Sequence, residues 1–314
     1  MLQLGIDWNP SPEIFRIGSL PIRYYGLMFV VAFLLGIRIM KRIYKNESVS
    51  EDYIDSLFMY VVLATLIGAR LGEVFFYSWD SFKHKPLEIF LPIAKDANGT
   101  LFGFIEGYTF TGFTGLASHG AAVGIIVAML LYRIKYKYKS LLWILDRIVI
   151  PVASGAAFVR LGNLMNSEIV GKETGSNFGF RFIRDHFSKR DAMTITNTND
   201  YEKAYDLIGN SVKYKHYLAE VPLRYPTQIF ESLSYVCVFL ILWFVYWKTE
   251  KKEKPGYLFG LFMVLLWSVR FVIEFFKEWQ GGLETIFMVN LNTGQLLSIP
   301  MILVGLYFMF RKTK

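Results

Sequence analysis

Apolar residues fall into long unbroken blocks along this chain, and not into the narrow stripes of a soluble amphipathic helix. Each block is about 20 residues long, which is the length that carries a helix across the hydrocarbon core of a bilayer. The pattern predicts an all-α polytopic membrane protein whose 314 residues form a single membrane domain. Seven transmembrane helices are expected, at residues 22–43, 54–77, 114–133, 141–164, 226–247, 256–277 and 293–311.

Clusters of Lys and Arg beside these helices predict how the chain is oriented. They follow the first, third, fifth and seventh helices, within residues 41–45, 133–139, 248–254 and 311–314. Basic residues that flank membrane helices mark the cytoplasmic side. We therefore expect the N-terminus outside and the C-terminus in the cytoplasm. The formal net charge of +8 is then a topology signal, and nucleic-acid binding is not needed to explain it.

With this orientation, the two longest polar segments lie outside the membrane. A loop of mixed polarity spans residues 78–113, and a longer insertion, rich in Asn, Asp, Lys and Tyr, spans residues 167–223. The charges of the insertion are roughly balanced, which favours a small external head over a basic tail.

The residues suited to metals or disulfides are few and scattered. Cys237 is the only cysteine and lies in an apolar block, so neither a disulfide nor a cysteine-based metal site is expected. His119 is the only histidine within a predicted span, and no paired-histidine spacing accompanies it. We expect no metal and no cofactor.

Polar residues of the predicted helices gather near the outer ends. Ionisable groups are costly inside a membrane and usually mark a function. The residues on that side are Tyr24, Tyr25, Arg70, Glu73, His119, Arg160, Asn163, Asn166, Glu168, Gln228, Glu231, Arg270 and Glu274. A one-sided polar chamber suits an enzyme that acts on the headgroup of an outer-leaflet lipid, whereas a transporter would place polar groups along a path or at the midplane.

The residue types in this chamber indicate a phosphorylated substrate. Arg70, Arg160 and Arg270 suit bidentate binding of a phosphate. Neighbouring glutamates would orient them, because an unpaired buried charge is costly. His119 is the natural proton acceptor near neutral pH. Together these residues favour group transfer from a phospholipid, and a lipid or solute transporter that binds its cargo in the same chamber is the alternative.

Each signal also has a purely structural explanation. An arginine near a helix end often extends to the membrane interface, and a lone histidine such as His119 is often a packing residue. Arg270 and Glu274 lie four apart on one helix face, which suits a structural ion pair. Tyr25 suits the aromatic belt at the membrane surface. The convergence of these residues on one leaflet is what favours a functional site.

The segment RLGNLMNSEIVG, at residues 160–171, ends the fourth predicted helix and carries a specific motif. It resembles the Arg-x-Gly-Asn-x-x-Asn-x-Glu-x-x-Gly signature of the prolipoprotein diacylglyceryl transferases. The segments RYYGLMF, GARLGEVFFY, SHGAAVG, RFVIEFF and GQLLSIPMILVG agree with that family in the same order. The resemblance implies an enzyme of the bacterial inner membrane that needs no cofactor. Its partners would be phosphatidylglycerol, which gives up its diacylglyceryl group, and a preprolipoprotein, whose lipobox cysteine receives it.

The resemblance, with the arginine pattern above, assigns roles residue by residue. The implied catalytic residues are Tyr25, His119, Arg160, Arg270 and Glu274. The residues implied in binding the headgroup or the peptide are Arg70, Arg160, Asn163, Asn166, Glu168, Gly171 and Arg270. Two positions depart from the family pattern: Leu266 stands where the family often has Tyr, and Ala121 stands where many members have a second Gly.

Overall fold

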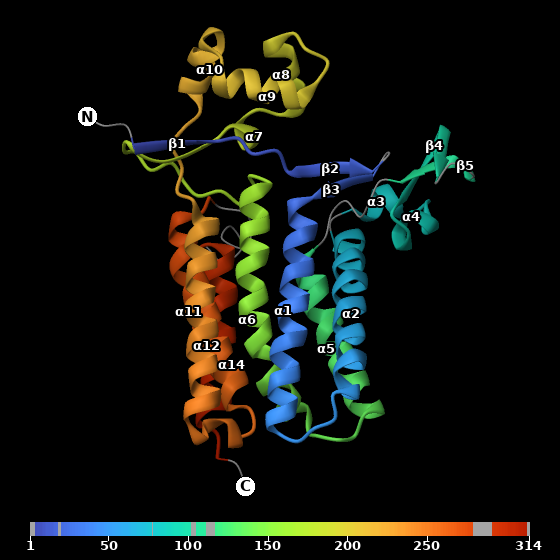
Figure 1. Cartoon of the computed structure of the whole chain (residues 1–314), viewed down its shortest axis with the longest axis vertical. Coiled ribbons are helices and arrows are strands. Elements are labelled where there is room, and N and C mark those ends of the chain that lie inside the picture. The colour runs from blue at the N-terminus through green and yellow to red at the C-terminus, as the bar shows by residue number, and fades with distance from the viewer. Residues whose placement is uncertain are drawn as a thin grey trace. The chain divides into compact units, whose positions relative to one another are not determined.

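The structure of the protein is a computed structural model that describes residues 4–17, 20–76, 78–101, 105–110, 117–278 and 291–312 (Figure 1). The chain divides into two compact units. Unit 1 consists of residues 1–39 and 145–314, and unit 2 consists of residues 40–144. Unit 1 is therefore discontinuous in sequence, with unit 2 inserted between its two parts.

All seven apolar blocks form helices close to the predicted bounds. They are α1 (Tyr24–Asn46), α2 (Asp52–Phe76), α5 (Ser118–Lys135), α6 (Leu141–Met165), α11 (Thr227–Lys248), α12 (Tyr257–Ile273, extended by the 3-10 turn η3, Glu274–Phe276) and α14 (Thr293–Phe310). Within the described residues, α2, α6, α11, α12 with η3, and α14 are the five helices long and apolar enough to cross a membrane. The protein is thus a mostly helical, polytopic membrane protein, and the count of seven spans stays a prediction.

The chain is not wholly helical, which the sequence pattern had not indicated. The described residues contain three two-stranded sheets, which pair β1 (Leu4–Trp8) with β6 (Phe178–Phe182), β2 (Glu13–Ile17) with β3 (Leu20–Arg23), and β4 (Ile93–Leu101) with β5 (Ile105–Phe110). All six strands lie in the segments that connect or precede the long helices. The pairing of β1 with β6 is parallel and joins residues about 170 positions apart, so no local pattern could reveal it.

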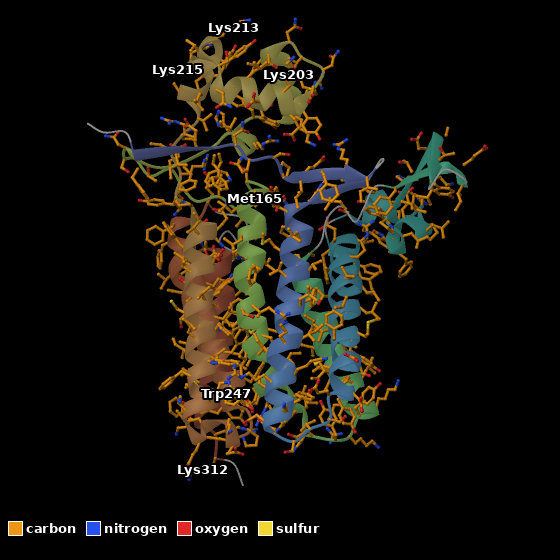
Figure 2. All side chains as sticks on the ribbon, viewed as in Figure 1. Met165, Lys203, Lys213, Lys215, Trp247 and Lys312 are labelled. Atoms are coloured by element: carbon orange, nitrogen blue, oxygen red, sulfur yellow. The ribbon has the colours of Figure 1, made fainter. Side chains whose placement is uncertain are left out.

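In unit 1, α11, α12 and α14 pack as neighbours below a small head (Figure 1). Gly260 of α12 meets Gly305 of α14 so closely that a Cβ on Gly260 would lie 2.6 Å from the Gly305 carbonyl oxygen. Small residues allow this close approach of helix backbones in a membrane. Figure 2 places Trp247 and Lys312 at one end of these helices and Met165, the last residue of α6, toward the other.

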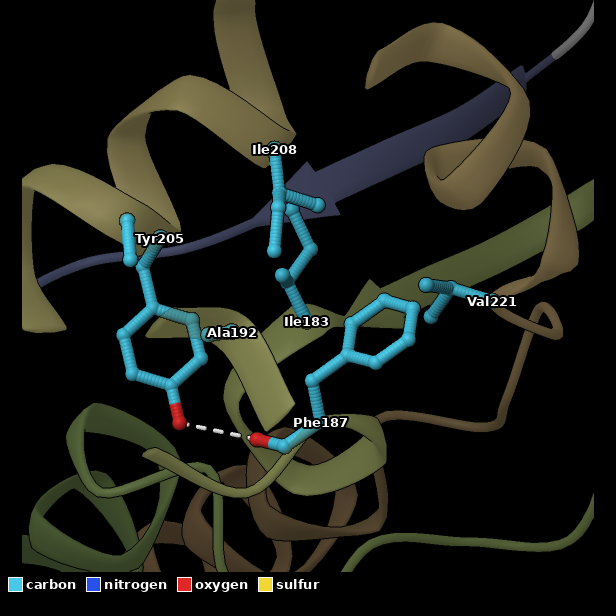
Figure 3. Packing of buried hydrophobic residues seen from close by; sticks show 7 residues of the cluster. Ile183, Phe187, Ala192, Tyr205, Ile208 and Val221 are labelled. Atoms are coloured by element: carbon cyan, nitrogen blue, oxygen red, sulfur yellow. Dashed lines mark hydrogen bonds between the residues drawn. The ribbon is translucent and has the colours of Figure 1, made fainter. Parts of the chain in front are cut away.

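The head carries short helices around an apolar core of its own (Figure 3). Its elements are α7 (Ile183–His186), α8 (Lys189–Thr196), α9 (Tyr201–Asn210), η1 (Val212–Tyr214) and α10 (Lys215–Glu220). Ile183, Ile208 and Val221 are buried in this core, and the Tyr205 hydroxyl donates to the Phe187 carbonyl at 2.8 Å. Ser188 begins α8 with a capping box, so side chains satisfy the N–H groups left open at that helix end.

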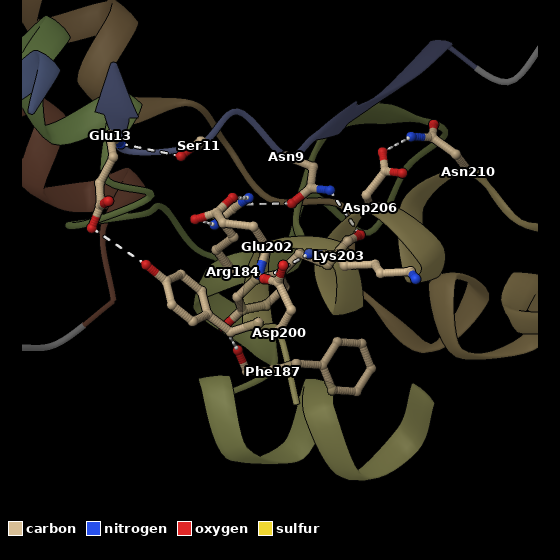
Figure 4. A network of polar contacts seen from close by, with 12 residues as sticks. Asn9, Ser11, Glu13, Arg184, Phe187, Asp200, Glu202, Lys203, Asp206 and Asn210 are labelled. Carbon is tan, nitrogen blue, oxygen red and sulfur yellow. Dashed lines mark hydrogen bonds and ion pairs between the residues drawn. The ribbon is translucent and has the colours of Figure 1, made fainter. Parts of the chain in front are cut away.

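Polar contacts join the head to the N-terminal strands (Figure 4). Arg184 donates to Glu202 through two nitrogens, at 3.1 and 2.7 Å, and its Nε donates to Asn9 Oδ1 at 3.0 Å. The Asn9 amide in turn donates to the Tyr205 carbonyl. The neighbouring Trp8 donates its indole N–H to the Leu164 carbonyl at 2.9 Å. Through Trp8 and Asn9, the N-terminal segment therefore ties the head to the end of α6.

In unit 2, the backbones of α2 and α5 are in close contact. A Cβ on Gly72 would lie 2.6 Å from the Gly120 Cα, and the Ala117 N–H donates to the Ala69 carbonyl at 3.0 Å. The glycines permit this approach, and the backbone at the start of α5, which includes His119, is fixed against α2. Between the two helices in sequence lie α3 (Trp79–Phe82), α4 (Pro86–Phe90) and the β4–β5 hairpin.

Candidate active site

The signature segment turns sharply as it leaves α6. Ser167 and Ile169 have φ angles of 54° and 58°, in the left-handed region that costs an L-residue about 1–2 kcal/mol and suits a β-branched side chain least. Two side chains from the first turn of α11 hold the turn: Thr227 Oγ1 donates to the Ile169 carbonyl at 3.0 Å, and Gln228 Nε2 donates to the Glu168 carbonyl at 2.7 Å. Such strain persists only where the surroundings enforce it, and it concentrates at functional sites.

The turn folds the polar residues of the signature back onto one another. Arg160 Nη1 donates to Asn163 Oδ1 at 3.2 Å. Asn163 and Asn166 both donate to the Glu168 carboxylate, at 3.4 and 3.2 Å. The structure therefore brings together the four predicted residues Arg160, Asn163, Asn166 and Glu168. Glu168 is exposed, so its carboxylate stays accessible.

A chain of ion pairs connects this segment to α11 and α12. Arg160 Nε lies 2.9 Å from Glu231 Oε2, and Lys277 Nζ lies 2.8 Å from Glu231 Oε1. Lys277 Nζ also lies 3.9 Å from Glu274, whose carboxylate is 3.5 Å from Arg270 Nε. Glu231 is fully buried and Lys277 is 3% exposed. A carboxylate without water needs such partners, because an uncompensated buried charge is costly.

The charges in this chain do not balance. Three cations, Arg160, Arg270 and Lys277, are joined to two carboxylates, Glu231 and Glu274. The guanidinium of Arg160 is partly exposed, at 17%, and that of Arg270 at 32%. Glu168, which is linked to Arg160 through Asn163, adds a third carboxylate beside these ion pairs. The two partly exposed arginines suit an anionic group such as a phosphate, which arginine binds in a bidentate manner.

The start of α14 fixes Glu274 from its other side. Asn292 Nδ2 donates to the Glu274 carbonyl at 3.0 Å and to its Oε2 at 3.1 Å. Asn292 also forms a capping box with Gln295 at the start of α14. A Cβ on Gly294 would clash with the Glu274 carboxyl group, so a larger residue there would displace this carboxyl group. Glu274 is thus held between Arg270, Lys277 and Asn292, in an orientation that it cannot easily leave.

Gly171 lies where three segments meet. Its N–H donates to the Tyr225 carbonyl at 3.0 Å, and it forms a bridge with Lys277. A Cβ at this position would lie 2.5 Å from the Tyr225 oxygen. Gly171 therefore permits a close backbone approach that joins the signature segment to the end of α12, which gives this predicted position a clear structural reason.

Tyr25 in the first turn of α1 also reaches the signature helix. A Cβ on Gly162 would lie 2.7 Å from the Tyr25 ring, so the ring lies directly on the backbone between Arg160 and Asn163. The predicted residues Tyr25, Arg160, Asn163, Asn166, Glu168, Gly171, Arg270 and Glu274 all belong to unit 1.

Three of the predicted polar residues, Arg70, Glu73 and His119, belong to unit 2. Arg70 is 6% exposed and donates to the carbonyls of Glu88 and Ile89, at 2.7 and 3.1 Å, so it supports the segment around α4. Glu73 accepts a hydrogen bond from Ser78 at 2.9 Å. The backbone of His119 is in the first turn of α5, and the His119 side chain lies outside the described residues. The predicted roles of Arg70 and His119 stay predictions.

Sequence reasoning missed three residues of this site. Lys277 lies three residues after Glu274 and so on the same helix face, which is the signal that would have found it. Asn292 and Gln295 have the spacing of a capping box just before an apolar run, which is a recognised helix-start pattern. The contact of Asn292 with Glu274 could not be read from that pattern, because the α12 and α14 segments are separate in sequence.

The fold and the site define a class: a polytopic membrane protein that gathers buried ion pairs and partly exposed arginines at one end of its helices. Comparison with known proteins narrows that class. The sequence model of the prolipoprotein diacylglyceryl transferase family matches residues 12–311, and the chain belongs to this family.

Three relatives extend over nearly the whole chain, and each carries the name phosphatidylglycerol–prolipoprotein diacylglyceryl transferase. The relative from Bacteroides fragilis is 34% identical over 309 residues, covering 98% of this chain and 96% of its own. The relative from Porphyromonas gingivalis is 35% identical over 316 residues, covering 98% and 95%. The relative from Tolumonas auensis is 31% identical over 307 residues, covering 98% and 97%.

Proposed function

We propose that this chain transfers the diacylglyceryl group of phosphatidylglycerol to the lipobox cysteine of a preprolipoprotein. One observation carries the proposal beyond family membership: the signature segment converges with α11 and α12 on the ion-pair chain of Arg160, Glu231 and Lys277. That arrangement supplies fixed, partly exposed guanidinium groups for a phosphate. It also leaves the amides of Asn163 and Asn166 beside them, for a glycerol ester or a peptide backbone.

The reaction is a displacement at carbon. The cysteine thiol gives its proton to His119, because the thiolate is the competent nucleophile. The thiolate then attacks the glycerol carbon that bears the phosphate. A carbon–sulfur bond forms, the carbon–oxygen bond breaks, and glycerol phosphate leaves with the electron pair. Arg160 and Arg270 bind the phosphate and stabilise the negative charge that develops on the leaving group.

The other residues of the site orient these groups. Glu231 and Glu274 hold the two arginines, through the ion pairs at 2.9 and 3.5 Å. Glu168 fixes the two asparagine amides through its hydrogen bonds. Tyr25 and Gly171 complete the site, Tyr25 through its hydroxyl and Gly171 through its close backbone approach. Arg70 is proposed as a further residue that binds the headgroup.

The site faces the outer leaflet of a bacterial inner membrane, in a topology of seven spans with the N-terminus outside. In support of this orientation, basic residues gather after α11 and after α14, around Trp247 and Lys312, at the end of unit 1 away from the head (Figure 2). Lys and Arg mark the cytoplasmic side of membrane helices. The head then lies in the periplasm, where a translocated peptide would meet it.

The decisive experiment is mass spectrometry of a lipobox peptide incubated with the purified protein and phosphatidylglycerol vesicles. We expect a diacylglyceryl mass increase on the cysteine of the peptide. Arg160→Ala should abolish it, while Arg190→Ala, which removes an exposed arginine of the head, should leave it unchanged. A folded parent protein that yields no mass increase would overturn the proposal and favour a transporter that binds lipid without modifying it.

A further inference from the structure

A buried carboxylate links α6 to α12 at the ends of these helices farthest from the candidate site. Asp146, in the second turn of α6, is fully buried. Its Oδ2 accepts from the Gly256 N–H at 2.6 Å, and its Oδ1 accepts from the Phe259 N–H at 2.8 Å. Gly256 is the residue that caps the start of α12, and it has no side chain to do so. Asp146 therefore supplies, from another helix, the cap that α12 lacks.

This contact is well suited to fix one helix against another. The first N–H groups of a helix have no partner within the helix, and the helix dipole favours negative charge at that end. Both oxygens of Asp146 are used, by donors three residues apart in α12. A single bond would allow α12 to rotate about its axis, whereas two bonds to one carboxylate fix its rotation as well as its height.

The spacing from this contact to the two arginines is the same on both helices. Arg160 lies 14 residues after Asp146, and Arg270 lies 14 residues after Gly256. The helices run in the same direction from the contact, so each arginine stands about 21 Å beyond it, at 1.5 Å per residue. Fourteen residues are close to four helical turns. Arg160 therefore returns nearly to the side of α6 that carries Asp146.

We propose that Asp146 is a positioning residue, which sets the height and rotation of α12 against α6 and thereby places Arg270 opposite Arg160. The expected effect on activity rests on the proposed function, in which the two arginines bind one phosphate. At the far end, the ion pairs through Glu231, Lys277 and Glu274 connect the same two helices. Those contacts join one side chain to another, whereas the Asp146 carboxylate bonds directly to the α12 backbone.

The test compares two substitutions at Asp146 with a matched control on the same helix. Asp146→Ala removes both bonds, and Asp146→Asn keeps one oxygen able to accept. Ser154→Ala removes a buried hydroxyl that donates within α6, to the Pro151 carbonyl at 2.8 Å. Spin labels at Val152 and Val272, both exposed on the helix surfaces, would report the α6–α12 distance in a Cys237→Ala background. Turnover is measured per folded molecule with phosphatidylglycerol and a lipobox peptide.

With Asp146→Ala we expect the distance distribution between the labels to shift and broaden, and the kcat per folded molecule to fall by about 10- to 100-fold, since a misplacement of roughly 1 Å can cost about 100-fold. Asp146→Asn should lie between Asp146→Ala and the parent in both measurements, and Ser154→Ala should match the parent. If Asp146→Ala does not fold, the graded response of Asp146→Asn decides.

Unchanged label distances in the Asp146 variants would overturn the proposal, and so would parental turnover in them. The distances are measured without substrate, so this outcome is separate from failure of the proposed function. That failure would instead appear as no turnover in the parent and in Ser154→Ala.

Discussion

Glu231 is the residue on which the charge balance of the site depends. It is fully buried and pairs with two cations, Arg160 at 2.9 Å and Lys277 at 2.8 Å. Glu231→Gln keeps the shape of the side chain but removes its charge, so Arg160 and Lys277 are left facing each other without the carboxylate that joins them. Breaking a buried pair from one side typically costs about 3–5 kcal/mol. We expect a loss of that size in the free energy of unfolding.

A second substitution, Lys277→Met, tests whether the loss comes from charge repulsion. Lys277→Met alone should destabilise the protein only modestly, because Glu231 remains paired with Arg160. In the Glu231→Gln background, the same substitution removes one of the two repelling cations. We therefore expect Lys277→Met to be stabilising there, with a coupling energy of about 1–3 kcal/mol between the two sites. The sign of the effect of Lys277→Met would reverse between the two backgrounds.

The assay is unfolding of the purified protein in mixed micelles by titration with sodium dodecyl sulfate, followed by tryptophan fluorescence. All four proteins of the cycle are measured under one condition. Additivity of the two substitutions within about 0.5 kcal/mol, the scatter expected of independent sites, would refute the charge argument. Gln228 provides a comparison: it is as buried as Glu231 but uncharged, so Gln228→Leu should show no coupling to Lys277→Met.

Two further predictions concern packing and pH. Gly260→Ala should lower the free energy of unfolding by about 1–3 kcal/mol, because its Cβ would lie 2.6 Å from a backbone oxygen. Gly26→Ala is the control, because a Cβ there would have nothing within 4 Å. Equal unfolding midpoints of the two variants would contradict the close contact between α12 and α14. Where β2 meets α9 of the head, a hydrogen bond from Arg16 lowers the pKa of Glu13 below its ordinary 4.5, and Tyr201 also donates to this carboxylate. The Glu13 carboxylate therefore stabilises the contact with Tyr201 above about pH 4.5, and this contribution is lost as the pH falls through the lowered pKa. Hydrogen exchange of α9 should accelerate over that range in the parent and show no such step in Glu13→Gln.

The membrane helices and much of the site could be predicted from the sequence, because both leave local signals. An apolar block of about 20 residues has one favourable fate in a bilayer, so the predicted bounds lie within a few residues of those observed for α1, α2, α6, α11 and α14. Four residues of the site, Arg160, Asn163, Asn166 and Glu168, lie within a stretch of nine residues, and the structure joins them through hydrogen bonds.

The features that the sequence did not reveal depend on contacts between distant segments. The parallel pairing of β1 with β6 satisfies backbone groups across the chain and needs no strong pattern in either strand. Lys277 reads as one more basic residue after a helix, and only the fold shows that it is buried against Glu231. Asp146 likewise reads as a lone acid in an apolar block. It accepts hydrogen bonds from backbone N–H groups of α12. Every residue except proline has such a group, so no sequence pattern marks these partners.

The pairing of β1 with β6 also affects the order in which the protein is made. About 170 residues separate the two strands, and at roughly 5–20 residues per second the ribosome takes about 10–30 s to synthesise them. Throughout that interval the β1 segment lacks its partner strand, so its backbone groups are open to pairing with another chain. Folding of unit 1 is therefore delayed until β6 has been synthesised. During this delay the nascent N-terminal segment must be kept from pairing with other chains.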